Sequence, residues 1–504
     1  MEHPSTETVG NIIGVSLIPQ TSRLMTQRQA ILTGLILLIL SFQVLVLVIL
    51  AFFPYVPDPG FSNLNIDIYF FLAPLSTILL LGLLYAWLIK LATREARHNS
   101  RRFDRLVQFL SEPFRILVAS VKTRSLSDSA RTFKILSHLR LLLAVSLAAS
   151  VLLALVPYRA DLNPSGSLAG IDSPLYVTWI NQMLARPLPQ ALQYSFVEGL
   201  DGSRPLLLVI LYAIASLGVS PAQVIEYLPM LLAPLLSLST YTFVKFGHGS
   251  RGLAGLTALL TPFSFYLTVG VWGGYYANML ALIFVFLFMT LLLLFSKSPS
   301  TTKYSVMLAL SVALFLTHPW TWILIITACL VFAVSLWRET GHSVHLKSVT
   351  GIIITGIALD LLKSTLFATR TVAADAATKL PTTGQVASFW SNVVDGLLYT
   401  HSGLLGNWSI LGIGLFACFA LRFKDWFERL VLLWVAVASI PFLLLDSYNQ
   451  TRVVYDLPIP VLMATALLFF LPAIGTRNTR WPWIIIMLIL VLSANYALQG
   501  ILLL

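Results

Sequence analysis

The feature that most constrains this chain is a succession of apolar runs, each of about 20 residues, with few charges inside them. A hydrocarbon core of roughly 30 Å takes about 20 residues of α-helix, and the runs lack the strict alternation of a membrane β-barrel. A mean hydropathy of +0.85 and a charged fraction of 11% are outside the usual range of soluble proteins. We therefore predict an all-α, polytopic transmembrane helix bundle of about 13 spans.

The distribution of Lys and Arg residues predicts the orientation of the chain. Segment 93–140 carries eleven basic residues against four acidic ones, so the positive-inside rule places it in the cytoplasm. Within it, apolar residues from Phe103 to Leu110 recur with the spacing of a helix lying on an anionic membrane surface, although a solvated basic linker is the alternative. We expect 1–138 to be an N-terminal two-span segment with a basic cytoplasmic linker, and 139–504 to be the main module. The expected location is the cell membrane, with the N-terminus in the cytoplasm.

A third span over 141–156 would run outward and place the acidic loop 157–204 on the outer face. The apolar run that follows, 205–217, has only about 13 residues and is short for a span, so we interpret it as an interfacial or re-entrant helix. This interpretation keeps the later basic turns in the cytoplasm. The other spans are predicted over 30–53, 67–92, 224–243, 253–268, 276–295, 304–316, 320–337, 349–367, 405–421, 430–445, 453–471 and 483–502.

The acidic loop contains the first candidate for chemistry, the sequence from Gly170 to Leu184. Asp172 precedes a Ser-Pro turn that opens a helix, and Tyr176 follows one turn later. The carboxylate is therefore expected near a helix N-terminus, beside an aromatic ring. Such a group can take a proton from an acceptor hydroxyl, or hold a divalent metal ion together with a second acid. The alternative is a helix cap with no role in chemistry.

Two further candidates adjoin predicted helices at the outer face. Asp201 and Arg204 precede the short apolar helix, where the guanidinium can pair with a phosphate or only with lipid headgroups. Tyr275, Tyr276 and Asn278 follow a Gly-Gly pair at the outer end of a later span. Paired glycines allow close backbone approach. The aromatic rings can stack on a sugar or belong to the interfacial aromatic belt, but the belt does not account for the glycines or the asparagine.

The last two candidates are also at outer span ends. His318 and Trp320 surround a proline, and the histidine can ligate a metal or bond a phosphate, or be incidental to the end of a helix. Arg452 lies near membrane depth, where an unpaired charge costs at least ~2.5 kcal/mol. Its anionic partner is expected to be Asp446, Asp456 or a lipid-linked phosphate.

The order of these parts resembles the GT-C class of membrane glycosyltransferases, which includes aminoarabinose transferases, protein O-mannosyltransferases and oligosaccharyltransferases. Members of that class have an acidic first outer loop with a helix reading roughly D-x-x-x-Y, then a basic residue, a proline and a short surface helix, and a Gly-Val-Ser turn into the next span. The matching segments are Asp172-Ser-Pro-Leu-Tyr176, Ser203-Arg204-Pro205-Leu206 and Leu217-Gly218-Val219-Ser220-Pro221. The resemblance covers about residues 141–337, and His318-Pro319 and Arg452 are similar to features of such enzymes.

The resemblance implies transfer of a sugar from a polyprenyl-phosphate carrier to an outer glycan, lipid or protein acceptor, with inversion at the anomeric carbon. Asp172 would take the acceptor's proton, with Asp161 as the other candidate base, and Arg204 or Arg452 would neutralise the phosphate. A divalent ion such as Mg or Mn, held by Asp161 and Asp172, is compatible with the reaction but not required. The expected partners are the bilayer, the carrier and the acceptor, with no nucleic acid. The residues expected to bind substrate are Tyr176, Asp201, Arg204, Tyr275, Tyr276, Asn278, His318, Trp320 and Arg452.

Two other functions compete with this one. A lipid or sugar transporter or flippase would carry ionisable groups at mid-membrane, whereas here the nearest exceptions to placement at span ends are Asp360, Lys363 and Asp456. A membrane scaffold without chemistry is the third interpretation. The two cysteines, Cys329 and Cys418, lie inside apolar runs and are expected to be packed and unreactive.

Overall fold

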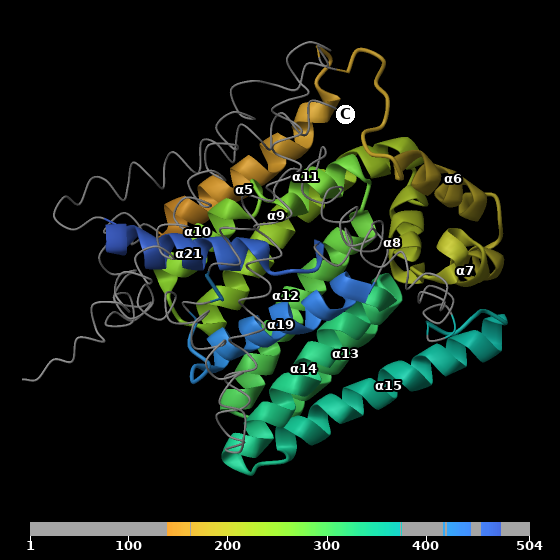
Figure 1. Ribbon diagram of the computed structural model, residues 1–504. Coiled ribbons are helices and arrows are strands. Elements are labelled where there is room, and N and C mark those ends of the chain that lie inside the picture. Colours follow the sequence, from red (N-terminus) through yellow and green to blue (C-terminus); the bar gives the residue numbers. More distant parts are fainter. Residues whose placement is uncertain are drawn as a thin grey trace, which may run out of the picture.

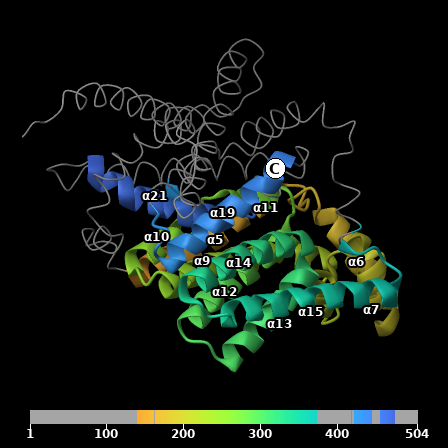
Figure 2. The ribbon, with the colours of Figure 1, turned by 60° about the horizontal axis from the view of Figure 1, so that its bottom comes forward.

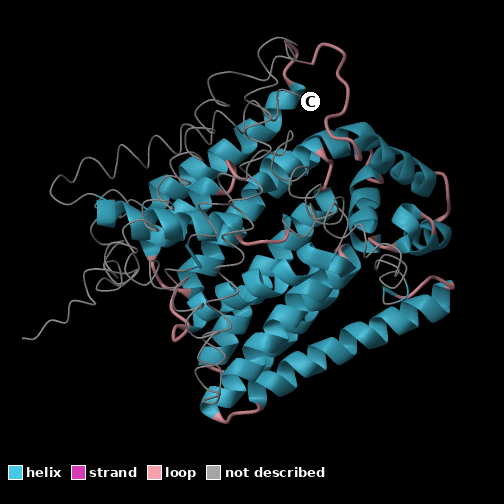
Figure 3. Ribbon diagram, in the orientation of Figure 1, coloured by secondary structure: helices cyan, strands magenta, loops and turns pink. Residues whose placement is uncertain are grey.

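The computed structural model describes residues 139–161, 163–372, 374, 417–418, 421–444 and 455–474. The predicted N-terminal segment 1–138 and the predicted last span 483–502 lie outside these ranges. Every regular element in the described ranges is a helix, and none of them contains a strand (Figure 3). The all-α prediction is therefore confirmed.

From α6 to α15, the helices follow one another with short connections (Figure 1). Five stretches in the described ranges are long and apolar enough to cross a membrane: Arg140–Tyr158, Pro221–Gly247, Tyr276–Lys297, Pro319–Thr340 and Val344–Phe367. The chain is thus a helical membrane protein. The helices are α5 (Leu139–Leu155), α6 (Ser173–Leu184), α7 (Leu188–Val197), α8 (Pro205–Ala215), α9 (Pro221–Gly247), α10 (Arg251–Leu260), α11 (Phe265–Trp272), α12 (Tyr276–Lys297), α13 (Thr301–Thr317), α14 (Pro319–Thr340), α15 (Val344–Phe367), α19 (Trp426–Leu444) and α21 (Ile459–Ile474), with 3-10 turns η2 (Val156–Tyr158) and η3 (Gly199–Gly202).

One predicted span is two helices. The apolar run 253–268 divides into α10, which ends at Leu260, and α11, which begins at Phe265. Pro262 lies between them; it has no backbone N–H and disfavours helical geometry in the residue before it, so the helix stops there. The short run after the acidic loop forms α8, which has 11 residues and is too short to cross a bilayer, as predicted.

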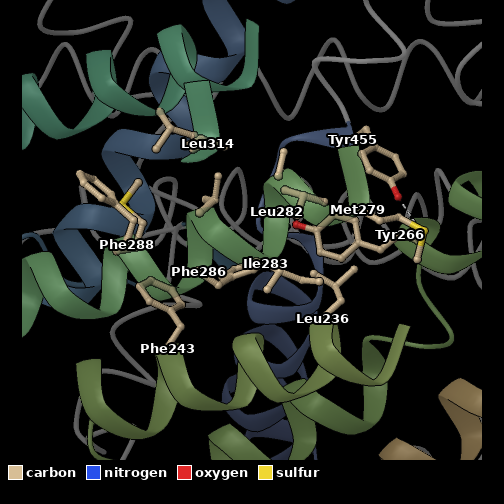
Figure 4. Close-up of a cluster of buried hydrophobic side chains, with 14 of the residues drawn as sticks. Leu236, Phe243, Tyr266, Met279, Leu282, Ile283, Phe286, Phe288, Leu314 and Tyr455 are labelled. Carbon is tan, nitrogen blue, oxygen red and sulfur yellow. Dashed lines mark hydrogen bonds between the residues drawn. The ribbon is translucent and has the colours of Figure 1, made fainter. Parts of the chain in front are cut away.

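Helix α12 is the centre of the bundle. It packs against α9, α13, α14 and α11, and Met279, Leu282 and Phe286 on it are buried (Figure 4). An aromatic cluster extends this core, because the Phe286 ring lies 5.7 Å from that of Phe243 on α9 and 5.5 Å from that of Trp434 on α19. The core therefore joins elements that are far apart in the sequence.

The basic turns meet at one end of this bundle. At the end of α12, Lys297 Nζ donates a hydrogen bond to the Gly247 carbonyl at the end of α9, at 3.1 Å. Arg429 at the start of α19 forms an ion pair with Glu339 at the end of α14. The opposite end of α12 begins at Tyr276 and lies beside the acidic loop. The acidic loop and these basic turns thus occupy opposite ends, as the predicted topology requires.

Helix α15 lies along the outside of the bundle and reaches α7 at its C-terminal end (Figures 1 and 2). Ile354, Leu361 and Leu366 on it are exposed, as expected of side chains that face lipid. The contact of α15 with α14 depends on Gly356, because a Cβ there would lie 2.2 Å from the ring of Trp322. That ring is held by a hydrogen bond from its Nε1 to Ser311 Oγ at 2.7 Å.

We therefore predict that Gly356→Val destabilises the protein by roughly 1–3 kcal/mol, because the new side chain must push α15 away from Trp322. The measurement is the thermal unfolding midpoint in detergent micelles. Ala358→Val on the exposed face of the same helix is the control and should leave the midpoint unchanged. Equal midpoints for the two variants would show that α15 does not pack on Trp322 through Gly356.

Candidate functional site

The candidate site is built around a close backbone contact between the acidic loop and the turn from α11 to α12. The backbone N–H of Asp172 donates a hydrogen bond to the carbonyl of Gly273 at 3.3 Å. A Cβ on Gly274 would lie 3.0 Å from the Asp172 nitrogen, and one on Gly170 would lie 2.6 Å from the Val271 carbonyl oxygen. Gly170 and Gly274 have φ angles of +98° and +66°, where glycine alone is unstrained. The predicted role of the Gly-Gly pair in close backbone approach is what the structure shows.

A buried hydroxyl network fastens the same contact. Ser173 Oγ at the start of α6 donates to the Ala169 carbonyl and lies 2.9 Å from the Tyr276 hydroxyl. The Tyr276 hydroxyl also lies 3.2 Å from the Ala169 carbonyl. All of these groups are buried, so the hydrogen bonds hold α6 on the first residue of α12. Sequence reasoning missed Ser173, whose position after Asp172 looks like an ordinary turn residue.

Asp172 occupies the N-cap position of α6, but its side chain forms no capping hydrogen bond with that helix, whose residues are all described. The carboxylate is half-buried and lies near Tyr176. A purely structural cap would be expected to accept a hydrogen bond from the N2 or N3 backbone N–H. Asp172 is thus the N-cap residue of α6 by position, without a side-chain cap, and its role in chemistry stays a prediction.

Tyr176 is fully buried and connects Asp172 with Arg204. Its ring lies 5.7 Å from that of Tyr276 and 5.3 Å from that of Trp179. Burial raises the pKa of its hydroxyl, the Arg204 guanidinium opposes this shift, and the Asp172 carboxylate reinforces it. The acidic and the basic residue of the two loop motifs therefore both lie near one phenol.

Arg204 is only 7% exposed. It forms no ion pair with any acid in the described ranges, whereas Arg159 pairs with Asp161 and Arg186 pairs with Glu198. A buried guanidinium without an anion bears a desolvation cost that a bound anion would offset. Its place at the N-cap of α8, directly before Pro205, holds its backbone beside α6.

The N-terminus of α12 adds hydrogen-bond donors to this place. Its N-cap, Tyr275, provides no side-chain cap for the positive helix end, and the Tyr276 N–H donates to the Gly274 carbonyl at 2.8 Å. Asn278 in that turn is 2% exposed, and its Nδ2 has no hydrogen-bond partner in the described part of the chain. The backbone N–H of Ala277 lies close to the Tyr176 hydroxyl. This arrangement suits an anion.

Helix α11 and the turn that follows it also contact a second polar cluster, around Tyr455 and Asp456. The Tyr455 hydroxyl donates to the Tyr266 carbonyl at 2.6 Å (Figure 4), and a Cβ on Gly270 would lie 2.6 Å from that hydroxyl. Beside Tyr455, the Asp456 carboxylate accepts a hydrogen bond from Thr321 Oγ1 at 2.8 Å. Arg452 lies outside the described residues, so its predicted partners stay untested.

His318 belongs to this second cluster. Its Nδ1 accepts a hydrogen bond from the Thr321 backbone N–H at 3.2 Å, so the ring caps α14. Thr321 thereby links His318 to Asp456, and the ring is 1% exposed. Sequence reasoning missed Thr321. Its place three residues after His318 was a usable signal, because a capping side chain accepts from the backbone N–H at that position.

The remaining predicted residues are placed as follows. Asp161 is 60% exposed and forms an ion pair with Arg159 at 2.5 Å, so it lies in a surface pair. Trp320 is partly buried in the first turn of α14, and Tyr275 is partly buried with its ring 6.0 Å from that of Tyr455. Asp201 is in η3, and its side chain lies outside the described set.

The described residues contain no group of three or more His, Cys, Asp or Glu side chains that could hold a metal. A metal held by Asp161 and Asp172 stays a prediction. The two cysteines are buried and free, as expected.

The glycine contact gives a matched test. Gly170→Ala and Gly218→Ala impose nearly the same backbone strain, with φ angles of +98° and +96°, but the new Cβ meets the Val271 carbonyl only at position 170. We predict that Gly218→Ala costs about 1–2 kcal/mol and that Gly170→Ala costs at least about 1 kcal/mol more. The difference would be read from thermal unfolding midpoints. A larger loss in Gly218→Ala would contradict this contact.

Comparison with known proteins gives structural neighbours alone, since no family model and no curated protein matches the chain. The fold is similar to the apo crystal structure of the Archaeoglobus fulgidus oligosaccharyltransferase, at 12% identity and a TM-score of 0.46, over 72% of this chain and 55% of that one. It is also similar to the Archaeoglobus fulgidus oligosaccharyltransferase AglB in complex with an inhibitory peptide and a dolichol-phosphate, at 15% identity and a TM-score of 0.44, over 70% and 55%.

This chain thus spans about half the length of those structures. At this level of likeness, the function has to be argued from the chain's own residues.

Proposed function

We propose that this protein is a membrane glycosyltransferase that moves a sugar from a polyprenyl-phosphate carrier to an acceptor hydroxyl or amide at the outer face of the cell membrane. The observation that carries the proposal is the buried Arg204 guanidinium, which has no anionic partner in the described ranges and lies near Tyr176, as the Asp172 carboxylate also does. One place thus combines a cation for a phosphate with an acid that can act as a base.

The carrier phosphate fits the cation. Its lipid chain can lie in the bilayer against the apolar helices, while its phosphate reaches Arg204 at the end of the bundle. The N-terminus of α12 and the Nδ2 of Asn278 add hydrogen-bond donors, and none of these groups competes as an acceptor. As the bond between the anomeric carbon and the phosphate oxygen breaks, the leaving phosphate keeps the electron pair and gains negative charge. Donors already aimed at that charge lower the barrier.

Asp172 is the proposed base. Its backbone is held by the Gly273 carbonyl, so its carboxylate has a defined position beside the phosphate site. The acceptor group attacks the anomeric carbon from the face opposite the phosphate and transfers its proton to Asp172, which inverts the configuration. Asp161 is less suited, because it is exposed and its hydrogen bond with Arg159 lowers its pKa, which makes it a weaker base.

The first prediction concerns the base. Asp172→Asn should reduce turnover by about 10²–10⁴-fold and leave polyprenyl phosphate binding within about threefold of wild type. The assay follows release of polyprenyl phosphate from a panel of radiolabelled carrier-linked sugars, with protein in liposomes and peptide, glycan and lipid acceptors supplied in parallel. Glu198→Gln, an exposed acid of the same loop, is the matched control and should keep full activity. Turnover that survives Asp172→Asn would reject Asp172 as the base.

The second prediction concerns the phosphate. Arg204→Gln should weaken binding of polyprenyl phosphate by about 10–100-fold, because a hydrogen-bonded charge pair contributes about 1.5–3 kcal/mol. Arg186→Gln removes an arginine that already pairs with Glu198 and should bind normally. Equal affinities for Arg204→Gln and wild type would place the phosphate elsewhere.

A further inference from the structure

Helix α15 carries two buried charged residues on an otherwise largely exposed helix. Asp360 is 9% exposed and Lys363 is 7% exposed, whereas neighbouring apolar residues such as Leu361 and Leu362 face outward. Lipid-exposed helices rarely contain ionisable residues, and such residues usually face protein and have partners. The partners of Asp360 and Lys363 therefore show which part of the protein the C-terminal end of α15 contacts.

Lys363 has a partner in the acidic loop, and the partner of Asp360 follows α15 in the chain. Lys363 Nζ donates a hydrogen bond to the Gly202 carbonyl of η3 at 3.2 Å. Next to it, the rings of Phe367 on α15 and Phe196 on α7 are stacked, with centroids 4.8 Å apart and an interplanar angle of 9°. On the other side, Asp360 Oδ2 accepts a hydrogen bond from the backbone N–H of Val372 at 2.9 Å, which folds the chain after α15 back on the helix. The end of α15 is thus fastened to the loop.

Gly202 is a tightly constrained point in that loop. Its φ angle is +64°, and a Cβ would lie 2.1 Å from the Phe196 carbonyl oxygen, so the turn closes directly on α7. Its carbonyl is consequently directed to α15, where the ammonium group meets it. A hydrogen bond from a charged donor is stronger than one from a neutral donor, so Lys363 holds this carbonyl firmly.

Arg204 follows Gly202 by two residues. Two residues of chain span at most about 7 Å, so a shift of the Gly202 peptide is passed on to the Arg204 backbone. Arg204 has no ion pair in the described ranges that would hold its guanidinium in place independently. Its position depends on the turn before it and on α8 after it.

We propose that Lys363 is a positioning residue for Arg204, and that α15 thereby holds the phosphate-binding guanidinium against Tyr176. The proposal rests on the proposed function in that the ligand of Arg204 is the carrier phosphate. The contact itself, a hydrogen bond from the buried Lys363 ammonium to the Gly202 carbonyl, does not depend on which reaction the protein catalyses.

The test compares Lys363→Met, which keeps the apolar stem but removes the ammonium, with Lys363→Arg, which can still donate to the carbonyl. Lys363→Met should raise the KM for the carrier-linked sugar and the Kd for polyprenyl phosphate about tenfold, with kcat within about twofold. Lys363→Arg should recover most of the affinity. Lys347→Met, at the exposed opposite end of the same helix, is the control and should behave as wild type.

A double variant separates positioning from general damage. If Lys363 acts through Arg204, adding Lys363→Met to Arg204→Gln should reduce the affinity for polyprenyl phosphate little further. Both substitutions would then weaken the same contact with the phosphate. Losses that multiply, a fall in kcat at unchanged KM, or no rescue by Lys363→Arg would overturn the proposal. If Lys363→Met does not fold, Phe367→Leu loosens the same junction and should produce the same rise in KM.

Hydrogen exchange keeps this result distinct from failure of the proposed function. If wild type neither binds nor turns over any carrier, the transferase proposal fails, but the backbone N–H groups of 199–204 can still be followed. Faster exchange there in Lys363→Met than in Lys347→Met supports the positioning contact. Equal exchange in both variants overturns it.

Discussion

The site depends on one close approach of two backbones, where the Asp172 turn lies directly on Gly273 and Gly274 between α11 and α12. A side chain on Gly170 or Gly274 would collide with backbone atoms, so both glycines are needed for the contact. Because α12 is the centre of the bundle, this contact ties the acidic loop to the best-packed element of the described structure. The positions of Asp172 and Tyr176 follow from it, and on its other side the turn contacts Tyr455, next to Asp456.

The electrostatic arrangement follows from that geometry. The loop presents Arg204, which has no anionic partner in the described ranges, at the N-terminal end of α12, where backbone and side-chain donors gather. Buried donors without acceptors are costly in an empty protein and useful in one that binds an anion. In the proposed transferase, the Asp172 carboxylate near Tyr176 is the base, a group that a simple anion receptor would not need. Lys363 adds a support from the membrane-facing side of the molecule.

Much of the fold could be predicted because hydropathy is local. The runs that became α9, α12, α14 and α15 were located to within a few residues, and the shortness of α8 was recognised. The break between α10 and α11 was missed, because apolar residues on both sides of Pro262 hid a local stop signal. The predicted roles of the candidate site residues stay predictions, but some of their structural surroundings were recognisable in the sequence. Asp172, Tyr176 and Arg204 were named as candidates, and the role of Gly-Gly in close approach was anticipated. Nothing in the sequence indicated that Ser173 would fasten this loop to α12 or that Lys363 would contact it.

By itself, the sequence determined that this is a helical membrane protein with a polar, acidic loop between apolar runs, because the bilayer imposes helix length and apolar composition on each span separately. Only the tertiary structure decided which polar groups meet. Lys363 and Gly202 are separated by 161 positions, and Ser173 and Tyr276 by 103, yet each pair is in hydrogen-bonding contact. Helix packing determines which polar groups form such pairs, because a polar side chain can hydrogen-bond with any suitable partner that packing brings within about 3 Å.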